Sequence, residues 1–279
     1  MSGRPLRRPH PPQPTGPAGR RSGAFLAGRA LALVGLLGLL AGCAVERGLG
    51  DPVDLRVFAA ASLTEAFESL APDFEAAQPG YRLVFNFAGS DALATQLLEG
   101  ARADVFAAAD ERQMARLIEA QLVEPPRTFV HNRLALITAL DLDPPLRRPS
   151  DLSRPGLRLV LAGPEVPAGR YAREALRQLG AWPAAEVNLV SEELDVKGVV
   201  GKVLLGEADA GMVYVSDVTP AVAGELSTLA LPPSVSLRAS YPAARLRAAP
   251  EPAGADAFLD FLFDPQAVTA LRARGFETP

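Results

Sequence analysis

From residue 55 onward, short apolar runs alternate with longer amphipathic segments. The first run, residues 55–60, suits a buried strand, and residues 63–77 then repeat apolar side chains at helical spacing until Gln78, Pro79 and Gly80 end the helix. Two more units of this kind follow, with strands at 81–88 and 103–108 and helices at 92–99 and 111–120. This βαβαβα order favours a mainly parallel sheet covered by helices on both faces.

A second block of the same kind begins near Arg133. It contains predicted strands at 134–138, 157–162, 187–190 and 210–215 and predicted helices at 172–179 and 196–205. The tail, 253–276, reads as two helices broken around Asp264 and Pro265.

Two blocks predict two lobes, and the tail needs a surface to pack against. We expect it to return to the first lobe, so that the chain crosses between lobes near 129–133 and again near 228–234, and the two crossovers form a hinge. Lobe I would then comprise residues 55–131 and 232–279, and lobe II residues 132–231.

The first 42 residues follow a different pattern. They carry six arginines and no acid, and end in an apolar run, 30–40, that is too short to span a bilayer and suits a secretory signal. Leu40-Ala41-Gly42-Cys43 resembles a bacterial lipoprotein cleavage box. We therefore expect a lipoprotein signal peptide at 1–42, lipidation at Cys43 and a tether at 43–54. This places the protein on a bacterial membrane, facing the periplasm or the exterior. The alternative is a structural cysteine after an ordinary signal.

Charge and residue inventory exclude several functions. The chain has a net charge of −4, and loss of the six leader arginines leaves −10, which argues against a nucleic-acid partner. Beyond the leader, Cys43 is the only cysteine and His131 the only histidine. One cysteine and one histidine cannot form a disulfide framework, a zinc site of the Cys and His kind, or a Cys-His nucleophile. We expect no catalytic residue, no cofactor and no direct metal ligand.

Several predicted strand-to-helix junctions carry residues that can donate hydrogen bonds. Ser62 with Glu65 reads as a capping box after the first strand, and Ser90 follows the second. In the second block, 166–169 and 193–197 precede helices. Taken singly, each is an ordinary helix start, but helix N-termini at the carboxyl ends of strands are also where open α/β sheets bind anions.

Six segments of the chain, with the junctions among them, follow one another in a recognisable order: FAAASLT at 58–64, FAGS at 87–90, ADVF at 103–106, VPAGRYA at 166–172, GEADAGMVY at 206–214 and RGF at 274–276. Their order and spacing resemble the molybdate-binding proteins of bacterial ABC importers, over roughly residues 55–276. The resemblance implies an α/β fold of the type II periplasmic-binding-protein class: two lobes, each a mostly parallel sheet flanked by helices, with the ligand cleft between them.

The resemblance also implies a ligand set for a tetrahedral dianion. The contacts would be the hydroxyl and N–H of Ser62 and of Ser90, the backbone N–H of Ala168 and of Val196, and the phenol of Tyr214. A fully deprotonated oxyanion needs only donors, and oriented dipoles supply them without a counter-charge. Taken alone, Tyr214 would read as a packing aromatic.

Two positions depart from the family pattern. Asp91 stands where a small neutral residue is frequent, and we expect it to point away from the anion and cap its helix. Lys197 stands where arginine is common, and is either a counter-charge or a solvated surface lysine.

The implied function is capture of molybdate, and of the nearly isosteric tungstate, by a monomeric binding protein that delivers it to an ABC permease and its ATPase. Sulfate has the same charge and shape but is smaller, and phosphate would need an acceptor such as Asp91, so both remain alternatives. A lipid-anchored hydrolase using carboxylates such as Asp104 and Asp110 is the alternative from another class.

Overall fold

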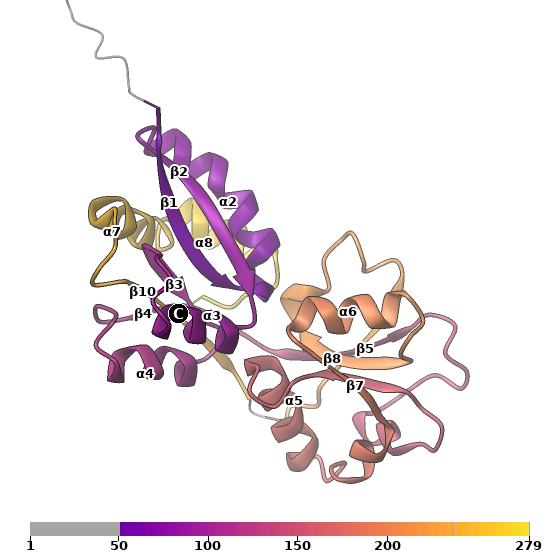
Figure 1. Ribbon diagram of the computed structural model, residues 1–279. Helices are drawn as coiled ribbons and strands as arrows, with labels where there is room; N and C mark the ends of the chain where they lie inside the picture. The colour runs from indigo at the N-terminus through magenta and orange to yellow at the C-terminus, as the bar shows by residue number, and fades with distance from the viewer. Residues whose placement is uncertain (1–50, 236, 279) are drawn as a thin grey trace, which may run out of the picture. The chain divides into compact units, whose positions relative to one another are not determined.

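The computed structural model describes residues 51–235 and 237–278 (Figure 1). The expected signal peptide, the lipidation at Cys43 and the tether up to residue 50 lie outside these residues. Within the described part of the chain, no helix is both long and apolar enough to cross a membrane.

The first lobe is built on a five-stranded sheet of order β2-β1-β3-β10-β4. Strand β1 pairs in parallel with β2 and β3, whereas β10 runs antiparallel to both β3 and β4. Four strands therefore share one direction and β10 opposes them. The strands are β1 (Val53–Ala60), β2 (Tyr81–Ala88), β3 (Val105–Ala107), β4 (Arg127–Asn132) and β10 (Ala239–Arg245).

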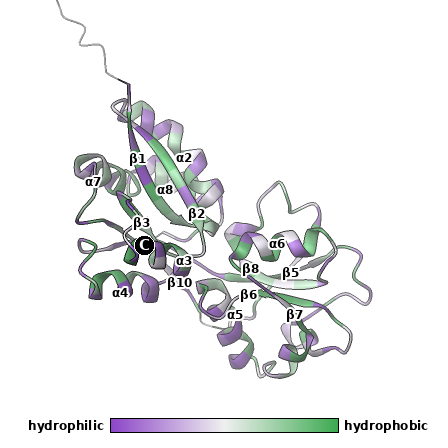
Figure 2. Ribbon diagram, viewed as in Figure 1, coloured by the Kyte–Doolittle hydropathy of each residue, from purple (hydrophilic) through white to green (hydrophobic). Residues whose placement is uncertain are grey.

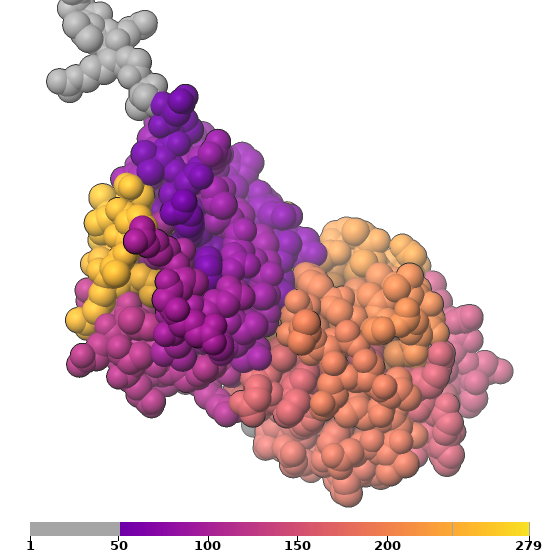
Figure 3. Space-filling view, in the orientation of Figure 1, coloured from indigo at the N-terminus to yellow at the C-terminus, as the bar shows by residue number. Residues whose placement is uncertain are grey.

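Helices from both ends of the chain cover this sheet. In α2, Phe67 and Phe74 are buried, and both meet Phe258 of α7 edge-on at 5.5 and 5.3 Å between ring centroids. Figure 3 shows the C-terminal segment, in yellow, against the indigo and magenta first lobe. The helical segments are η1 (Ala61–Leu63), α2 (Thr64–Ala77), α3 (Ser90–Leu98), α4 (Glu111–Glu119), α7 (Pro252–Phe261) and α8 (Pro265–Ala273).

The second lobe repeats this topology. Its sheet has the order β7-β6-β8-β5-β9, with β6 parallel to β7 and β8, and with β5 antiparallel to β8 and β9. Again one strand of five opposes the rest. The elements are β5 (Leu134–Ala139), η2 (Pro149–Ser153), β6 (Leu159–Ala162), α5 (Pro167–Gln178), η3 (Ala184–Asn188), β7 (Leu189–Glu193), α6 (Val196–Leu204), β8 (Ala210–Tyr214), η4 (Val215–Asp217) and β9 (Leu226–Ala230).

The hydropathy pattern accounts for the layers. Strands β6 and β8 are buried along their whole length, as expected of strands covered on both faces. Helices such as α4 bury one stripe of side chains and expose the other, so purple and green alternate along them in Figure 2.

The predicted two-lobed α/β fold is confirmed, but three strands were not predicted. In β10, Pro242 interrupts the apolar run, and the pairing with β4 shifts register between Tyr241 and Pro242, where a bulge accommodates the proline. Strand β9 is short and mostly exposed, and β4 was read as a crossover. Helix α5 begins at Pro167, five residues before the predicted start, because proline suits the first helical turn.

The chain passes from β4 to β5 through Arg133 alone, and it returns to the first sheet between Ala230, the end of β9, and Ala239, the start of β10. Asn132, expected as the first residue of lobe II, ends β4 in the first sheet. At the other end, β1 begins at Val53, so the last two residues of the expected tether belong to a strand.

Candidate functional site

A pocket lies where the carboxyl ends of strands from both lobes face each other. Its cavity volume is about 10 Å³, which suits a small ion rather than a drug-sized ligand, for which pockets run to about 300–1,000 Å³. All five residues of the implied ligand set line it: Ser62, Ser90, Ala168, Val196 and Tyr214. The other lining residues are Ala60, Ala61, Ala88, Gly89, Ala109, Val166, Pro167 and Asp195.

Ser62 reaches the pocket from η1, directly after β1. It is buried, and its Oγ lies 2.8 Å from the phenol oxygen of Tyr241 in β10. The expected capping box is wrong: α2 begins after Leu63 with no side-chain cap, and Glu65 instead pairs with Lys197. The Ser62 hydroxyl is therefore available to the pocket because it is not used to cap a helix.

Ser90 is the first residue of α3, after β2. Its Oγ accepts a hydrogen bond of 3.0 Å from the backbone N–H of Ala109, and the side chain is buried. A backbone N–H can only donate, so the Ser90 proton points elsewhere.

Ala168 lies in the first turn of α5, where backbone N–H groups have no partner within the helix. The next residue, Gly169, packs against the end of β6: a Cβ there would lie 2.1 Å from the carbonyl oxygen of Gly163 and 2.2 Å from that of Ala162. Glycine is thus required for the close approach that brings the N-terminus of α5, and with it the Ala168 N–H, to the pocket.

Val196 opens α6, whose N-cap is Asp195. The Asp195 carboxylate accepts from the N–H groups of Lys197 and Gly198, at 2.8 and 3.0 Å. This cap satisfies the second and third donors of the helix and leaves the Val196 N–H, the first, for the pocket.

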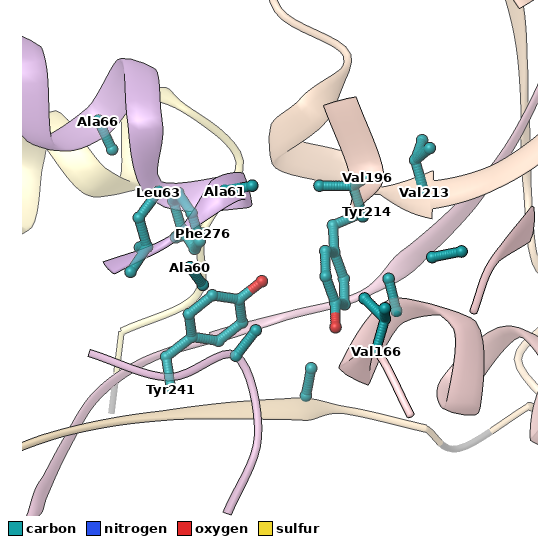
Figure 4. Close-up of a cluster of buried hydrophobic side chains, with 14 of the residues drawn as sticks. Ala60, Ala61, Leu63, Ala66, Val166, Val196, Val213, Tyr214, Tyr241 and Phe276 are labelled. Carbon is teal, nitrogen blue, oxygen red and sulfur yellow. The ribbon is translucent and has the colours of Figure 1, made fainter. Parts of the chain in front are cut away.

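Tyr214 ends β8 and is fully buried, and its hydroxyl has no hydrogen-bond partner among the described residues. Burial raises the pKa of its phenol well above the ordinary value, so the group stays protonated and can donate. Figure 4 shows Tyr214 below Val196 with its oxygen toward Val166, facing Tyr241 on the other side of the gap. A buried phenol without a partner needs an explanation, and a bound acceptor supplies one.

The electrostatics of the pocket come from dipoles rather than cations. No lysine or arginine is among its lining residues, whereas the N-termini of α3, α5 and α6 all contribute to it. Helix N-termini carry a partial positive charge and point N–H groups at an anion. In the described part of the chain, no cluster of three or more His, Cys, Asp or Glu side chains could hold a metal ion.

The two departures from the family pattern lie outside the pocket lining. The Asp91 side chain does not cap α3, which corrects the expected role. Its Oδ1 is buried without a hydrogen-bond partner among the described residues, and burial raises the pKa of this carboxyl. Lys197 is half-buried and engaged by two carboxylates rather than free at the surface: its Nζ lies 2.7 Å from Glu65 Oε2 and 3.3 Å from Asp217 Oδ1.

Ion pairs join the lobes around the pocket. Lys197 of α6 contacts Glu65 of α2, and Arg170 of α5 donates to Asp110, the N-cap of α4, at 2.9 Å. Asp110 is buried and Arg170 is one-third exposed. These pairs were not foreseen, because ion pairs between residues 60 or more positions apart leave no local pattern in one sequence.

The hydrogen-bonded group behind Ser62 was also missed. It comprises Tyr241, Asn132 and Ser216, which come from β10, β4 and η4. Two of the three lie in strands that were not predicted, so nothing placed them near Ser62. The feature of the sequence that marks this group is Tyr241 next to Pro242, and a tyrosine beside a proline by itself predicts no role.

Comparison with known proteins identifies the family. Residues 55–277 match a family described as bacterial extracellular solute-binding protein. The chain belongs to this family. The resemblance to molybdate-binding proteins is confirmed by relatives that are 39% and 34% identical. Because the family consists of solute-binding proteins, the chain is a binding protein and not an enzyme.

Three curated relatives are similar over most of the chain. The molybdate-binding protein ModA of Mycobacterium tuberculosis is 39% identical, with 80% of this chain and 84% of the relative covered. ModA of Escherichia coli is 34% identical over 86% and 97%. A Bacillus subtilis protein described as a putative ABC transporter substrate-binding lipoprotein, YvgL, is 32% identical over 64% and 70%.

Solved structures share the two-lobed fold. The substrate-binding domain of a putative molybdenum ABC transporter from Clostridium difficile has a TM-score of 0.62 and 28% identity, covering 81% of this chain and 99% of that one. The Azotobacter vinelandii periplasmic molybdate-binding protein (TM-score 0.72, 24% identity, 81% and 99%) and the Mycobacterium tuberculosis sulfate-binding protein SubI (0.73, 15%, 81% and 87%) show similarity of fold alone.

Proposed function

We propose that this chain captures molybdate, and also tungstate, between its lobes and delivers it to an ABC permease served by an ATPase. The observation that carries the proposal is the composition of the pocket: neutral donors from both lobes, three helix N-termini, no cation among the lining residues, and a buried phenol, that of Tyr214, with no partner in the described part of the chain. The ligands proposed are Ser62, Ser90, Ala168, Val196 and Tyr214. No cofactor takes part.

The donor set favours a fully deprotonated oxyanion over phosphate. Hydrogen phosphate carries a proton and needs an acceptor. One carboxylate, Asp195, is among the lining residues, and its Oδ1 is held by the backbone N–H groups of Lys197 and Gly198 as the cap of α6. Asp91 does not line the pocket, and the five proposed ligands all donate. Sulfate shares the charge and the protonation state of molybdate, so it is the second candidate, distinguished by size.

Isothermal titration with molybdate, tungstate, sulfate and phosphate tests the substrate, using the chain without its leader and lipid. We expect one-to-one binding of molybdate and tungstate, with sulfate at least a hundredfold weaker, equivalent to about 2.7 kcal/mol. Sulfate or phosphate binding without molybdate binding would retain the fold and overturn the substrate.

We further propose that Cys43 carries a lipid that holds the monomeric protein at the outer side of a bacterial membrane. The cleavage-box sequence supports this, and so does the lipoprotein description of the Bacillus subtilis relative. Metabolic labelling with palmitate tests the anchor: the wild type should incorporate label and a Cys43→Ala variant should not. Equal labelling of both would contradict lipidation at this residue.

A further inference from the structure

We propose that Tyr241 is a positioning residue that fixes the direction of the Ser62 hydroxyl, so that this hydroxyl presents only its proton to the anion. The inference rests on the proposed function and adds a residue that does not itself line the pocket. It follows from the order of donors and acceptors in one buried group of side chains.

Asn132 sets the direction of the group. Its Oδ1 accepts the backbone N–H of Arg133 at 2.9 Å, and because that N–H can only donate, the amide oxygen must be the atom on this side. The amide nitrogen, Nδ2, then faces Ser216 Oγ at 2.8 Å and the Tyr241 hydroxyl at 3.4 Å. Nδ2 has only protons to offer, so the Tyr241 oxygen is the acceptor in this contact.

Tyr241 must donate its O–H hydrogen bond to Ser62 Oγ. Its side chain is fully buried, and burial raises the pKa of its phenol well above the ordinary value, so the O–H is retained. A buried O–H without an acceptor costs about 1–3 kcal/mol. Among the described residues, the acceptor that the phenol proton can reach is Ser62 Oγ at 2.8 Å.

Ser62 therefore accepts from Tyr241, and its own proton points away from Tyr241, where the side chain lines the pocket. Ser90 is held in the same way by a different partner, since its Oγ accepts the Ala109 N–H. Both seryl hydroxyls are thus fixed as donors before the anion arrives, because one hydrogen bond accepted by each oxygen sets the direction of its proton.

A double-mutant cycle tests this role, using molybdate or sulfate, whichever the wild type binds. Tyr241→Phe keeps the ring and should weaken binding about three- to tenfold, since it frees the Ser62 hydroxyl to rotate. In a Ser62→Ala background the same change should have no further effect. In a Ser90→Ala background it should cost as much as in the wild type, because Ala109 orients Ser90. Tyr81→Phe, a phenol outside the pocket, should bind as the wild type does.

A second readout separates positioning from a general structural role. In the Tyr241→Phe variant the Ser62 hydroxyl can rotate and accept a hydrogen bond from a protonated ligand. The ratio of the affinity for the deprotonated anion to the affinity for hydrogen phosphate should therefore fall. Equal losses in the wild-type and Ser62→Ala backgrounds, or an unchanged affinity, would overturn the role of Tyr241 while leaving the proposed function intact. A wild type that binds phosphate in preference to both molybdate and sulfate would overturn both.

Discussion

At the scale of single residues, the pocket is organised so that its hydrogen-bond donors have no other partner within the part of the protein that the structure describes. The Asp195 cap occupies the N–H groups of Lys197 and Gly198 but not that of Val196. Ala109 occupies the acceptor side of Ser90, and Tyr214 has no partner among the described residues. Each proposed contact is thus a donor that the surrounding fold leaves unused.

Replacing Ser90 by alanine should weaken anion binding by about 1–3 kcal/mol, because a buried charged ligand would lose one hydrogen bond. The Ala109 N–H would also lose its acceptor. Titration calorimetry measures the change, and Ser69→Ala, the same substitution on α2 outside the pocket, is the control. Unchanged affinity of the Ser90 variant would remove this residue from the site.

Asp217 should make the stability of the protein depend on pH. Burial raises the pKa of this carboxyl to about 6, and the charge of Lys197 opposes the shift only in part. Since the folded form binds the proton more tightly than the unfolded chain, the stabilisation from this carboxyl is largest below about pH 4 and is lost as pH rises through about 6.

Urea unfolding at a series of pH values tests this effect. Between pH 4 and 7 the free energy of unfolding of the wild type should fall relative to that of Asp217→Asn by roughly 2 kcal/mol. Asp260→Asn, a substitution of an exposed carboxylate on α7, should follow the wild type. Parallel pH profiles for the wild type and Asp217→Asn would show that Asp217 titrates as it does in the unfolded chain.

At the scale of elements, the sequence predicts helices and parallel strands well because the repeat of apolar positions that identifies each of them lies within the element itself. Strand β2 has the predicted bounds, and α6 and β8 differ by one residue. Strand β10 was not predicted because it is stabilised by pairing with two strands, β3 and β4, that lie more than a hundred residues earlier in the chain. The five ligand positions were placed by resemblance, whereas Tyr241 and the ion pairs between lobes depend on tertiary contacts that no local pattern reports.

The junction between β6 and α5 should be intolerant of a side chain. Gly169→Ala would place a Cβ 2.1 Å from a carbonyl oxygen, so the start of α5 must move and carry the Ala168 N–H away from the pocket. We expect weaker anion binding and a lower free energy of unfolding, measured by calorimetry and urea unfolding.

Gly201→Ala is the matched control for that change. Gly201 lies within α6, and a Cβ there would meet nothing within 4 Å. Alanine should therefore raise the free energy of unfolding by up to about 1 kcal/mol, through helix propensity, without changing affinity. If both variants bound the anion as the wild type does, the close approach at Gly169 would have no part in placing the donor.

At the scale of the whole molecule, ion pairs between the lobes should help to hold the two lobes together around a bound anion. Arg170→Met would leave the buried Asp110 without its cation, and we expect faster anion release, by about five- to thirtyfold, because Arg170 is partly solvated and the pair is weaker than a fully buried one. Stopped-flow displacement measures the rate.

Arg112 and Glu165 also join α4 to the second lobe, at 2.8 Å, but both are more than half exposed. Arg112→Met should therefore change the release rate by less than about threefold, as expected of a surface pair. Release rates that are equal in the two variants would show that burial of the Asp110 pair does not distinguish them.

The position of β10 between β3 and β4 has a consequence for how the polypeptide folds as it is synthesised. The strands of the second sheet all lie within residues 134–230, so that sheet can form as soon as this stretch has left the ribosome. The first sheet keeps a gap between β3 and β4 until Ala239–Arg245 has been translated, and the same strand brings Tyr241 to Ser62. The anion pocket is therefore among the last parts of the protein to assemble, and a chain terminated before β10 should retain one folded lobe and no binding site.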